Sequence, residues 1–97
     1  MIVGVCRIAL LLPGCDSLKE KRSVVKRLLG RVRSRFNVAA AEVGDLDSRA
    51  HARLGFATVG SERDIVRGVL ERVIDFVEEQ YLGEVINEEI EVEHYGS

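Results

Sequence analysis

The chain has 97 residues, of which 46% are hydrophobic and 31% charged, and its net charge is −2. This length predicts a single domain over residues 1–97 with one modest core, and this composition excludes a disordered chain. The apolar stretch at residues 2–12 is shorter than the roughly 20 residues that span a membrane, and Arg7 interrupts it. We therefore expect a cytoplasmic protein without a membrane partner.

Residues 2–12 are mostly β-branched and aliphatic, which predicts a strand that ends at the turn dipeptide Pro13-Gly14. Ser17 and Glu20 have the spacing of a capping box, so a helix begins there. Apolar residues recur along this helix at helical spacing and predict one buried stripe. The stripe consists of Leu18, Val25, Leu28, Leu29, Val32 and Phe36.

The second half of the chain repeats the alternation of strand and helix. Residues 38–43 and 50–59 read as two strands of a hairpin with a long connection. A second cap at Ser61 and Asp64 opens a helix that Gly83 follows, and residues 84–95 alternate as a last strand. In the second helix we expect Ile65, Val69, Val73, Phe76 and Val77 to face inward, and in the last strand Ile86, Ile90 and Val92.

The resulting order, β-α-β-β-α-β, predicts an α+β ferredoxin-like fold. In it, two helices cover one face of a four-stranded antiparallel sheet with strand order 4-1-3-2. The outward positions of the first strand are nearly as apolar as its inward ones, which is unusual for a central strand facing water. A second copy of the chain is the simplest cover, and the expected homodimer contact is made by Val3, Val5, Ala9 and Leu11.

Charge is strongly separated along the chain. Residues 19–35 hold eight of the fourteen basic residues against one acid, and residues 71–97 hold nine acids against one arginine. On a helical wheel the cations of the first helix flank a strip of small residues, Ser23, Gly30 and Ser34. Lysine and arginine rows beside small residues suit a phosphate backbone, since arginine binds phosphate through two parallel hydrogen bonds. The expected RNA-binding residues are Lys19, Arg22, Lys26 and Arg33 on one flank, with Arg27, Arg31 and Arg35 on the other.

Two other interpretations of this helix stay open. Arginine stems commonly shield the edge of a core while their charged groups remain hydrated, so the face can simply be solvated. The acidic last third can also complement the helix, within one chain or across a dimer. A homodimeric structural or small-molecule-sensing module without nucleic acid is therefore the alternative function.

The sequence offers little for catalysis or metal binding. Glu42, Asp45, Asp47 and His51 lack any recognised ligand spacing, so we expect no metal and no cofactor. The turn at residues 13–17 could cradle an anion in an acylphosphatase-like enzyme, but a turn followed by a cap explains it better. No nucleophile–base pair is visible, and we expect a protein that is not an enzyme. The outward positions of the central strands hold no aromatic residue, which disfavours RNA binding on the sheet face.

Three segments carry a resemblance to a known family. Ser17-Leu18-Lys19-Glu20-Lys21-Arg22, Phe36-Asn37-Val38 and Ala41-Glu42-Val43 resemble the YlxP-like family of small bacterial proteins. The resemblance implies a ferredoxin-like fold and a cytoplasmic protein whose genes often neighbour those of translation and ribosome-maturation factors. An RNA or ribosomal particle is therefore the implied partner, with no implied enzymatic activity. Asp47 departs from the aromatic residue that the family tends to place in the hairpin loop.

Overall fold

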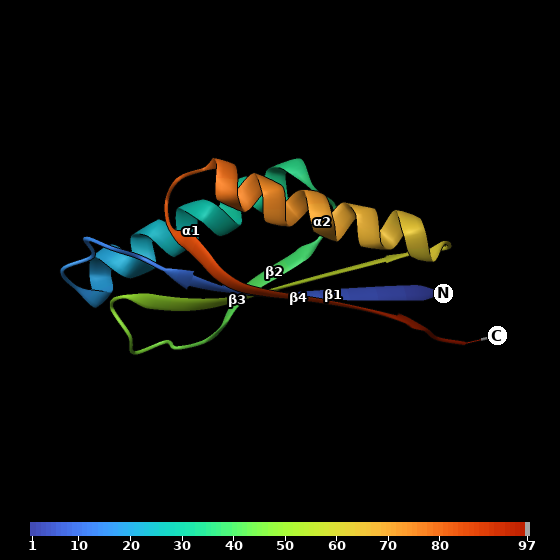
Figure 1. Cartoon of the computed structure of the whole chain (residues 1–97), viewed down its shortest axis with the longest axis horizontal. Helices are drawn as coiled ribbons and strands as arrows, with labels where there is room; N and C mark the ends of the chain where they lie inside the picture. The colour runs from blue at the N-terminus through green and yellow to red at the C-terminus, as the bar shows by residue number, and fades with distance from the viewer. Residues whose placement is uncertain (97) are drawn as a thin grey trace.

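The computed structural model describes residues 1–96 and contains six elements in the expected order. They are β1 (Ile2–Leu11), α1 (Leu18–Arg35), β2 (Ala39–Gly44), β3 (His51–Gly60), α2 (Arg63–Glu79) and β4 (Glu84–His94). The four strands form one antiparallel sheet in the order β2-β3-β1-β4, which is the predicted order read from the other edge. Figure 1 shows α1 and α2 on the same side of this sheet. Neither helix is long and apolar enough to cross a membrane.

The core lies between the sheet and the helices. Alternate residues of β1, from Ile2 to Leu10, are buried, while the residues between them are half-buried or exposed. Leu54 and Phe56 of β3 join them from the neighbouring strand. The helices contribute the other half of this core with Val25, Leu28, Leu29 and Val32 from α1 and Leu70, Val73, Ile74 and Val77 from α2. The face of the sheet turned away from the helices is called the open face below.

The start of α1 is capped as predicted. The Ser17 hydroxyl accepts a hydrogen bond from the Glu20 amide at 3.1 Å, and the Glu20 carboxylate accepts one from the Asp16 amide at 2.6 Å. The two bonds satisfy the backbone amides of Glu20 and Asp16, which have no carbonyl partner within the helix. The turn at residues 13–17 is thus explained by capping.

The prediction for α2 was partly wrong. The N-cap is Glu62, which makes no side-chain capping bond, so Ser61 does not cap the helix. Ile65 is 61% exposed, and the buried stripe instead includes Val66 and Leu70. The reason is Gly4 of β1, where an added Cβ would lie 2.5 Å from Val66 and 2.8 Å from Leu70. The helix therefore rests on this glycine through the neighbouring stripe.

Ile86 in β4 was also wrongly placed, since it is 50% exposed. The pairing of β1 with β4 shifts between Ala9 and Leu10: Ala9 pairs with Asn87 but Leu10 pairs with Val85. The extra residue in β4 is a bulge, which reverses which alternate residues of β4 point toward the core before and after it. Val85 therefore packs on the core in place of Ile86. Ile90 remains half-buried against the core, as expected.

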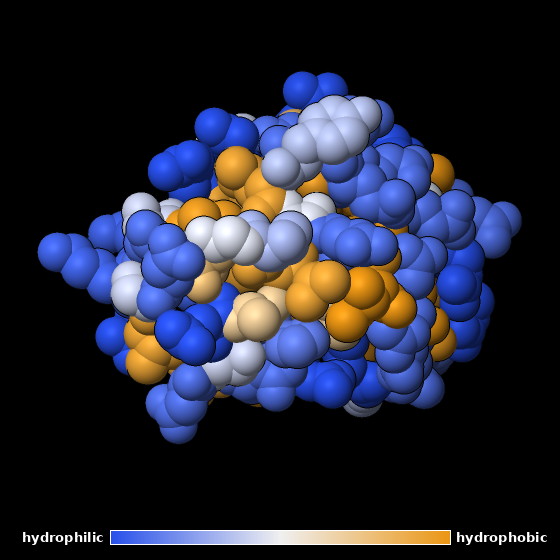
Figure 2. Space-filling view, turned by 60° about the vertical axis from the view of Figure 1, so that its left-hand side comes forward, coloured by the Kyte–Doolittle hydropathy of each residue, from blue (hydrophilic) through white to orange (hydrophobic). Residues whose placement is uncertain are grey.

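The two ends of the chain lie side by side (Figure 1). The amino group of Met1 donates to the carbonyl of Tyr95 at 3.0 Å, and the amide of Tyr95 donates to the carbonyl of Met1 at 2.7 Å. At the opposite end of the strands, the turn after α2 packs tightly against the end of β1. An added Cβ at Gly83 would lie 2.7 Å from Leu12, the residue that follows β1. Figure 2 turns the molecule to bring the other end forward and shows apolar atoms gathered within a hydrophilic surround.

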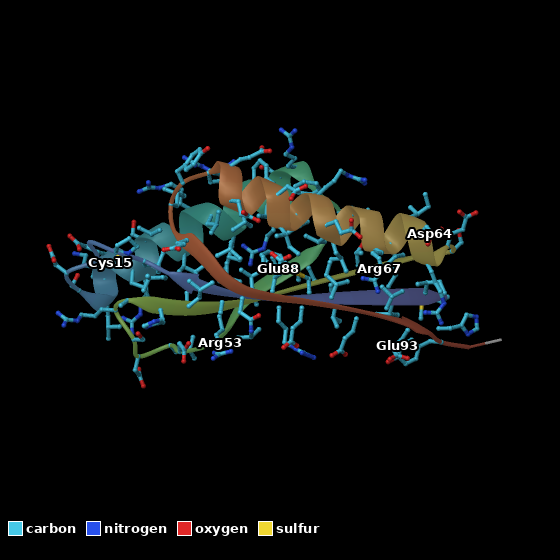
Figure 3. All side chains as sticks on the ribbon, in the orientation of Figure 1. Cys15, Arg53, Asp64, Arg67, Glu88 and Glu93 are labelled. Atoms are coloured by element: carbon cyan, nitrogen blue, oxygen red, sulfur yellow. The ribbon has the colours of Figure 1, made fainter. Side chains whose placement is uncertain are left out.

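The two cysteines differ sharply in their environment. Cys6 is buried under the helices, and burial, with a smaller effect of the nearby Glu88, raises the pKa of its thiol to about 11. Figure 3 shows Glu88 between the sheet and α2, and Cys15 at the far end of the molecule. Cys15 is only half-buried in the β1–α1 connection. Thiol chemistry requires the thiolate, so Cys6 is inert at neutral pH.

Alkylation should separate the two thiols. At pH 8, iodoacetamide is expected to modify the native protein at Cys15 alone, and both cysteines in denaturant, as measured by peptide mass spectrometry. Because the pKa of Cys6 is raised in the folded state, the unfolded state loses its proton first as the pH rises above about 8.5. Stability should therefore fall with pH above that value. Rapid modification of Cys6 in the native protein would contradict this assignment.

Candidate nucleic-acid interface on the first helix

Helix α1 presents most of its cations to solvent because its apolar stripe faces the sheet. Val25, Leu28, Leu29 and Val32 are buried. All seven predicted RNA-binding residues are exposed: Lys19, Arg22, Lys26, Arg27, Arg31, Arg33 and Arg35. The surface of α1 is therefore strongly positive, as the sequence predicted.

The cations form two rows that border different neighbours. Arg33 reaches the edge of the sheet, where its guanidinium donates to the carbonyl of Ala40 in β2. Lys19, Arg22 and Lys26 lie on the same side of the helix as Arg33 by helical spacing. We call these four residues the β2-side row.

The other row, Arg27, Arg31 and Arg35, borders α2. Arg31 donates to the side-chain carbonyl of Gln80 at 2.9 Å. The Arg35 guanidinium lies 5.2 Å from the centre of the Phe76 ring, in the geometry of a cation–π contact. These contacts hold two of the three arginines in place, and both are with uncharged groups.

Among the residues that the structure describes, no ion pair involves the exposed cations of α1. Over residues 1–96 the ion pairs are Arg7 with Glu89 and Glu91, Lys21 with Glu42, and Arg53 with Asp45. The acids of β4 thus pair with β1 at 2.8 and 3.0 Å, and Glu89 and then Glu91 raise the pKa of Arg7 above its ordinary value. Within residues 1–96 the acidic last third forms no ion pair with the exposed α1 cations, although Asp75 and Glu79 of α2 line the same surface pocket as Arg35.

One cation of this helix was misjudged. Lys21 has no exposed surface, and its ammonium group lies 2.6 Å from the Glu42 carboxylate and donates to the carbonyl of Asp45 at 2.7 Å. It was included in the charge of residues 19–35 but not among the expected RNA-binding residues, and its spacing from Leu18, Val25 and Leu28 places it on the buried stripe. The pair joins two of the segments that carried the family resemblance, Ser17–Arg22 and Ala41–Val43.

The strip between the two rows is open. An added Cβ at Gly30 would meet no other atom within 4 Å, and Ser23 and Ser34 on the same strip are exposed. Small residues let an extended anion approach the helix closely, with arginines on both sides. The strip is therefore open to solvent between the two rows of cations.

The openness of the strip at Gly30 can be tested by measuring the free energy of unfolding. Glycine within a helix costs about 0.5–1 kcal/mol relative to alanine. Gly30→Ala is expected to raise the free energy of unfolding by that amount, because the added methyl group meets nothing. In a domain of this size the melting temperature should rise by about 2–8 °C. A lower melting temperature in calorimetry would show that the strip is not open.

The other candidate sites do not assemble. Glu42 is held by Lys21, and the Asp45 carboxylate accepts a hydrogen bond from Arg53 at 3.1 Å. Within the described part of the chain, no three side chains of the metal-binding types come together. The candidate cluster of Glu42, Asp45, Asp47 and His51 is therefore a set of separate loop and strand contacts.

The fold belongs to the ferredoxin-like class of α+β proteins. A designed protein with a ferredoxin fold, LFR1 1, superimposes with a TM-score of 0.55 at 13% identity, covering 96% of this chain and 83% of its own. The chain belongs to the DUF503 family, described as proteins of unknown function, whose model matches residues 3–90. It is 36% identical over 77 residues to the uncharacterized protein YlxP of Bacillus subtilis (strain 168), which covers 79% of this chain and 84% of that protein. The family assignment confirms the resemblance found in the sequence.

Proposed function

We propose that this chain is a non-catalytic RNA-binding protein that holds an RNA or a ribosomal particle through the outer face of α1. The observation that carries the proposal is a row of exposed cations on each side of an open strip, without an acid of residues 1–96 in an ion pair with them. Like charges spaced by four residues repel one another along a helix. A bound polyanion would neutralise these charges and so relieve the repulsion.

The proposed contact is with the RNA backbone. Arginine and lysine neutralise phosphates without reading sequence, and the outward positions of β1, β2 and β3 hold no Phe, Tyr or Trp, so that His51 is their one aromatic side chain. Arg31 and Arg35 are already oriented by Gln80 and Phe76, so less side-chain freedom is lost when they bind. Binding should therefore be governed by RNA shape and by salt.

Filter binding with a structured RNA hairpin tests the proposal. The variant Arg22→Gln/Lys26→Gln/Arg27→Gln removes three cations that make no hydrogen bond to another described residue. Its control, Arg63→Gln/Arg67→Gln/Arg72→Gln, removes three exposed cations from α2, of which Arg63 also donates to the carbonyl of Val92 at 3.0 Å.

Each lost phosphate contact is expected to reduce the slope of log affinity against log salt by about 0.7–0.9. The α1 variant should therefore bind more weakly at low salt, with a slope lower by about 2–3, while the α2 variant keeps the slope of the wild type. Equal slopes for the α1 variant and the wild type would refute the proposal. With ribosomal subunits, the same variant should fail to co-sediment at low salt, where the wild type is retained.

A further inference from the structure

The open face of the sheet divides into a polar half and an apolar half. On the polar half, Arg7 bridges Glu89 and Glu91, and Glu93 follows on the same strand. On the apolar half, small side chains of β1, β2 and β3 line a shallow groove of about 480 Å³. Arg7 lines the groove as well as the polar half, and the other outward residues that line it are Val5, Ala39, Ala41, Val43, Gly55 and Ala57.

The groove is apolar surface that the chain leaves exposed. Val43 in the groove is 58% exposed, and Val59, which lies outside the groove on the same face of β3, is 63% exposed. The view in Figure 3 shows Arg53 and Glu93 pointing away from the helices on this side of the sheet. A flat apolar area with charged residues along one border is typical of an interface between protein surfaces.

We propose that the groove is the centre of a contact with a second copy of the chain, in which β3 of one copy lies over β3 of the other. The twofold axis then runs along β3 between the two sheets. With this axis, β1 of each copy lies over β2 of the other, so the apolar half of one face covers the apolar half of its partner. The groove, and not the first strand alone, is then the homodimer contact; Val5 remains in it.

Charge selects this arrangement among the ways of stacking two sheets. A stack with β4 over β4 would bring Glu89, Glu91 and Glu93 onto the same row of the partner, and like charges repel. A stack centred between β1 and β3 would bury the same carboxylates against Ala39 and Ala41, which costs their hydration. The stack centred on β3 keeps the β4 carboxylates off the partner's β4 and β2, and the charge that it covers is Arg7 of β1, which keeps its ion pairs with Glu89 and Glu91.

In that stack, the β4 of each copy passes beyond the β2 edge of its partner. The β2-side row of α1 lies along this edge, as the bond from Arg33 to Ala40 shows. The carboxylates of one copy therefore approach cations of the other around an apolar centre. Near the axis, Arg53 of one copy lies opposite Arg53 of the other copy. Each Arg53 is paired with Asp45 of its own chain at 3.1 Å, so its charge is balanced.

The size of the face predicts a dimer that depends on concentration. Strands of ten residues extend about 33 Å, and three strands side by side cover about 14 Å. This outline, roughly 460 Å² at most because β2 has only six residues, is smaller than the about 800 Å² per partner that a standard specific interface buries, so the predicted dimer is weak. We expect dissociation within the micromolar range.

Sedimentation equilibrium without nucleic acid tests the contact with a matched pair of variants. Val43→Glu places a charge in the groove, whereas Ile65→Glu places the same charge at a side chain of similar exposure, 61%, on α2. The wild type and Ile65→Glu should dimerise with increasing concentration, and Val43→Glu should stay monomeric with an unchanged circular dichroism spectrum. A monomeric wild type up to millimolar concentration, or a Val43→Glu variant that dimerises equally well, would overturn the proposal.

Cross-linking tests the orientation. In a Cys15→Ser background, a cysteine replacing Ala57 lies near the axis, and packed sheets are about 10 Å apart. A bismaleimide of that length should therefore link the introduced cysteine of one Ala57→Cys copy to the same cysteine of the other copy. Glu93→Cys should stay unlinked, because the two β4 strands lie on opposite borders of the dimer. The reverse result would show that β4 lies over β4 and would overturn the proposed stack.

Discussion

Replacing Lys21 with alanine is expected to lower the free energy of unfolding by about 3–5 kcal/mol, since it leaves the Glu42 carboxylate without its cation. Lys21 is fully buried, and its ammonium group serves both Glu42 and the carbonyl of Asp45. The matched control is Lys19→Ala, two residues earlier on the exposed side of the same helix, for which the change should stay within about 0.5 kcal/mol. Urea unfolding followed by circular dichroism measures both.

A double variant separates the loss of the pair from the loss of volume. Lys21→Met/Glu42→Leu replaces both charges with apolar groups, and such replacements are often neutral or stabilising by about 1–4 kcal/mol. The double variant should therefore be much more stable than Lys21→Ala. If Lys21→Ala were as stable as Lys19→Ala, the ammonium group would not be buried as described.

Gly4→Ala is the second substitution with a large expected effect, a destabilisation of about 1–3 kcal/mol. The new methyl group would lie 2.5 Å from Val66 and 2.8 Å from Leu70, closer than carbon atoms can approach. Val66 is β-branched and has few alternative rotamers, so α2 itself must move away from the sheet. Thermal unfolding should show a melting temperature lower by about 4–20 °C.

The partner substitution checks the cause. Val66→Ala removes the closest atom, so Gly4→Ala should cost less in the Val66→Ala background than in the wild type, with a coupling energy of about 0.5–3 kcal/mol. Strict additivity of the two changes would mean that the helix does not rest on Gly4. The opposite sign expected for Gly30→Ala excludes a general effect of replacing glycine.

Local patterns in the sequence were sufficient for the order of elements, the strand order and the start of α1. The capping box at Ser17 and the alternation in β1 depend on neighbours within a few residues, and both were confirmed. The inward face of α2 was not predictable in this way. Ile65, Val66, Val69 and Leu70 are all apolar, and the choice between two adjacent stripes is made by Gly4, about sixty residues away.

The candidate site shows the same division. Exposure of the cations on α1 follows from helical periodicity and was predicted correctly. The burial of Lys21 was missed because a lysine was read by its charge and not by its position on the wheel. The face of Ile86 was missed because the extra residue in β4 is visible only in the pairing with β1.

The hydrogen bonds between Met1 and Tyr95 have a consequence for how the chain folds. They join residues separated by 94 positions, and the whole β1–β4 pair connects the two ends of the sequence. Closing so long a loop carries a large entropic cost before any contact repays it. We therefore expect β1 to pair with β4 late in folding, after contacts between segments that are closer in sequence. Once formed, the β1–β4 pair places the first and last strands side by side and brings Met1 next to Tyr95.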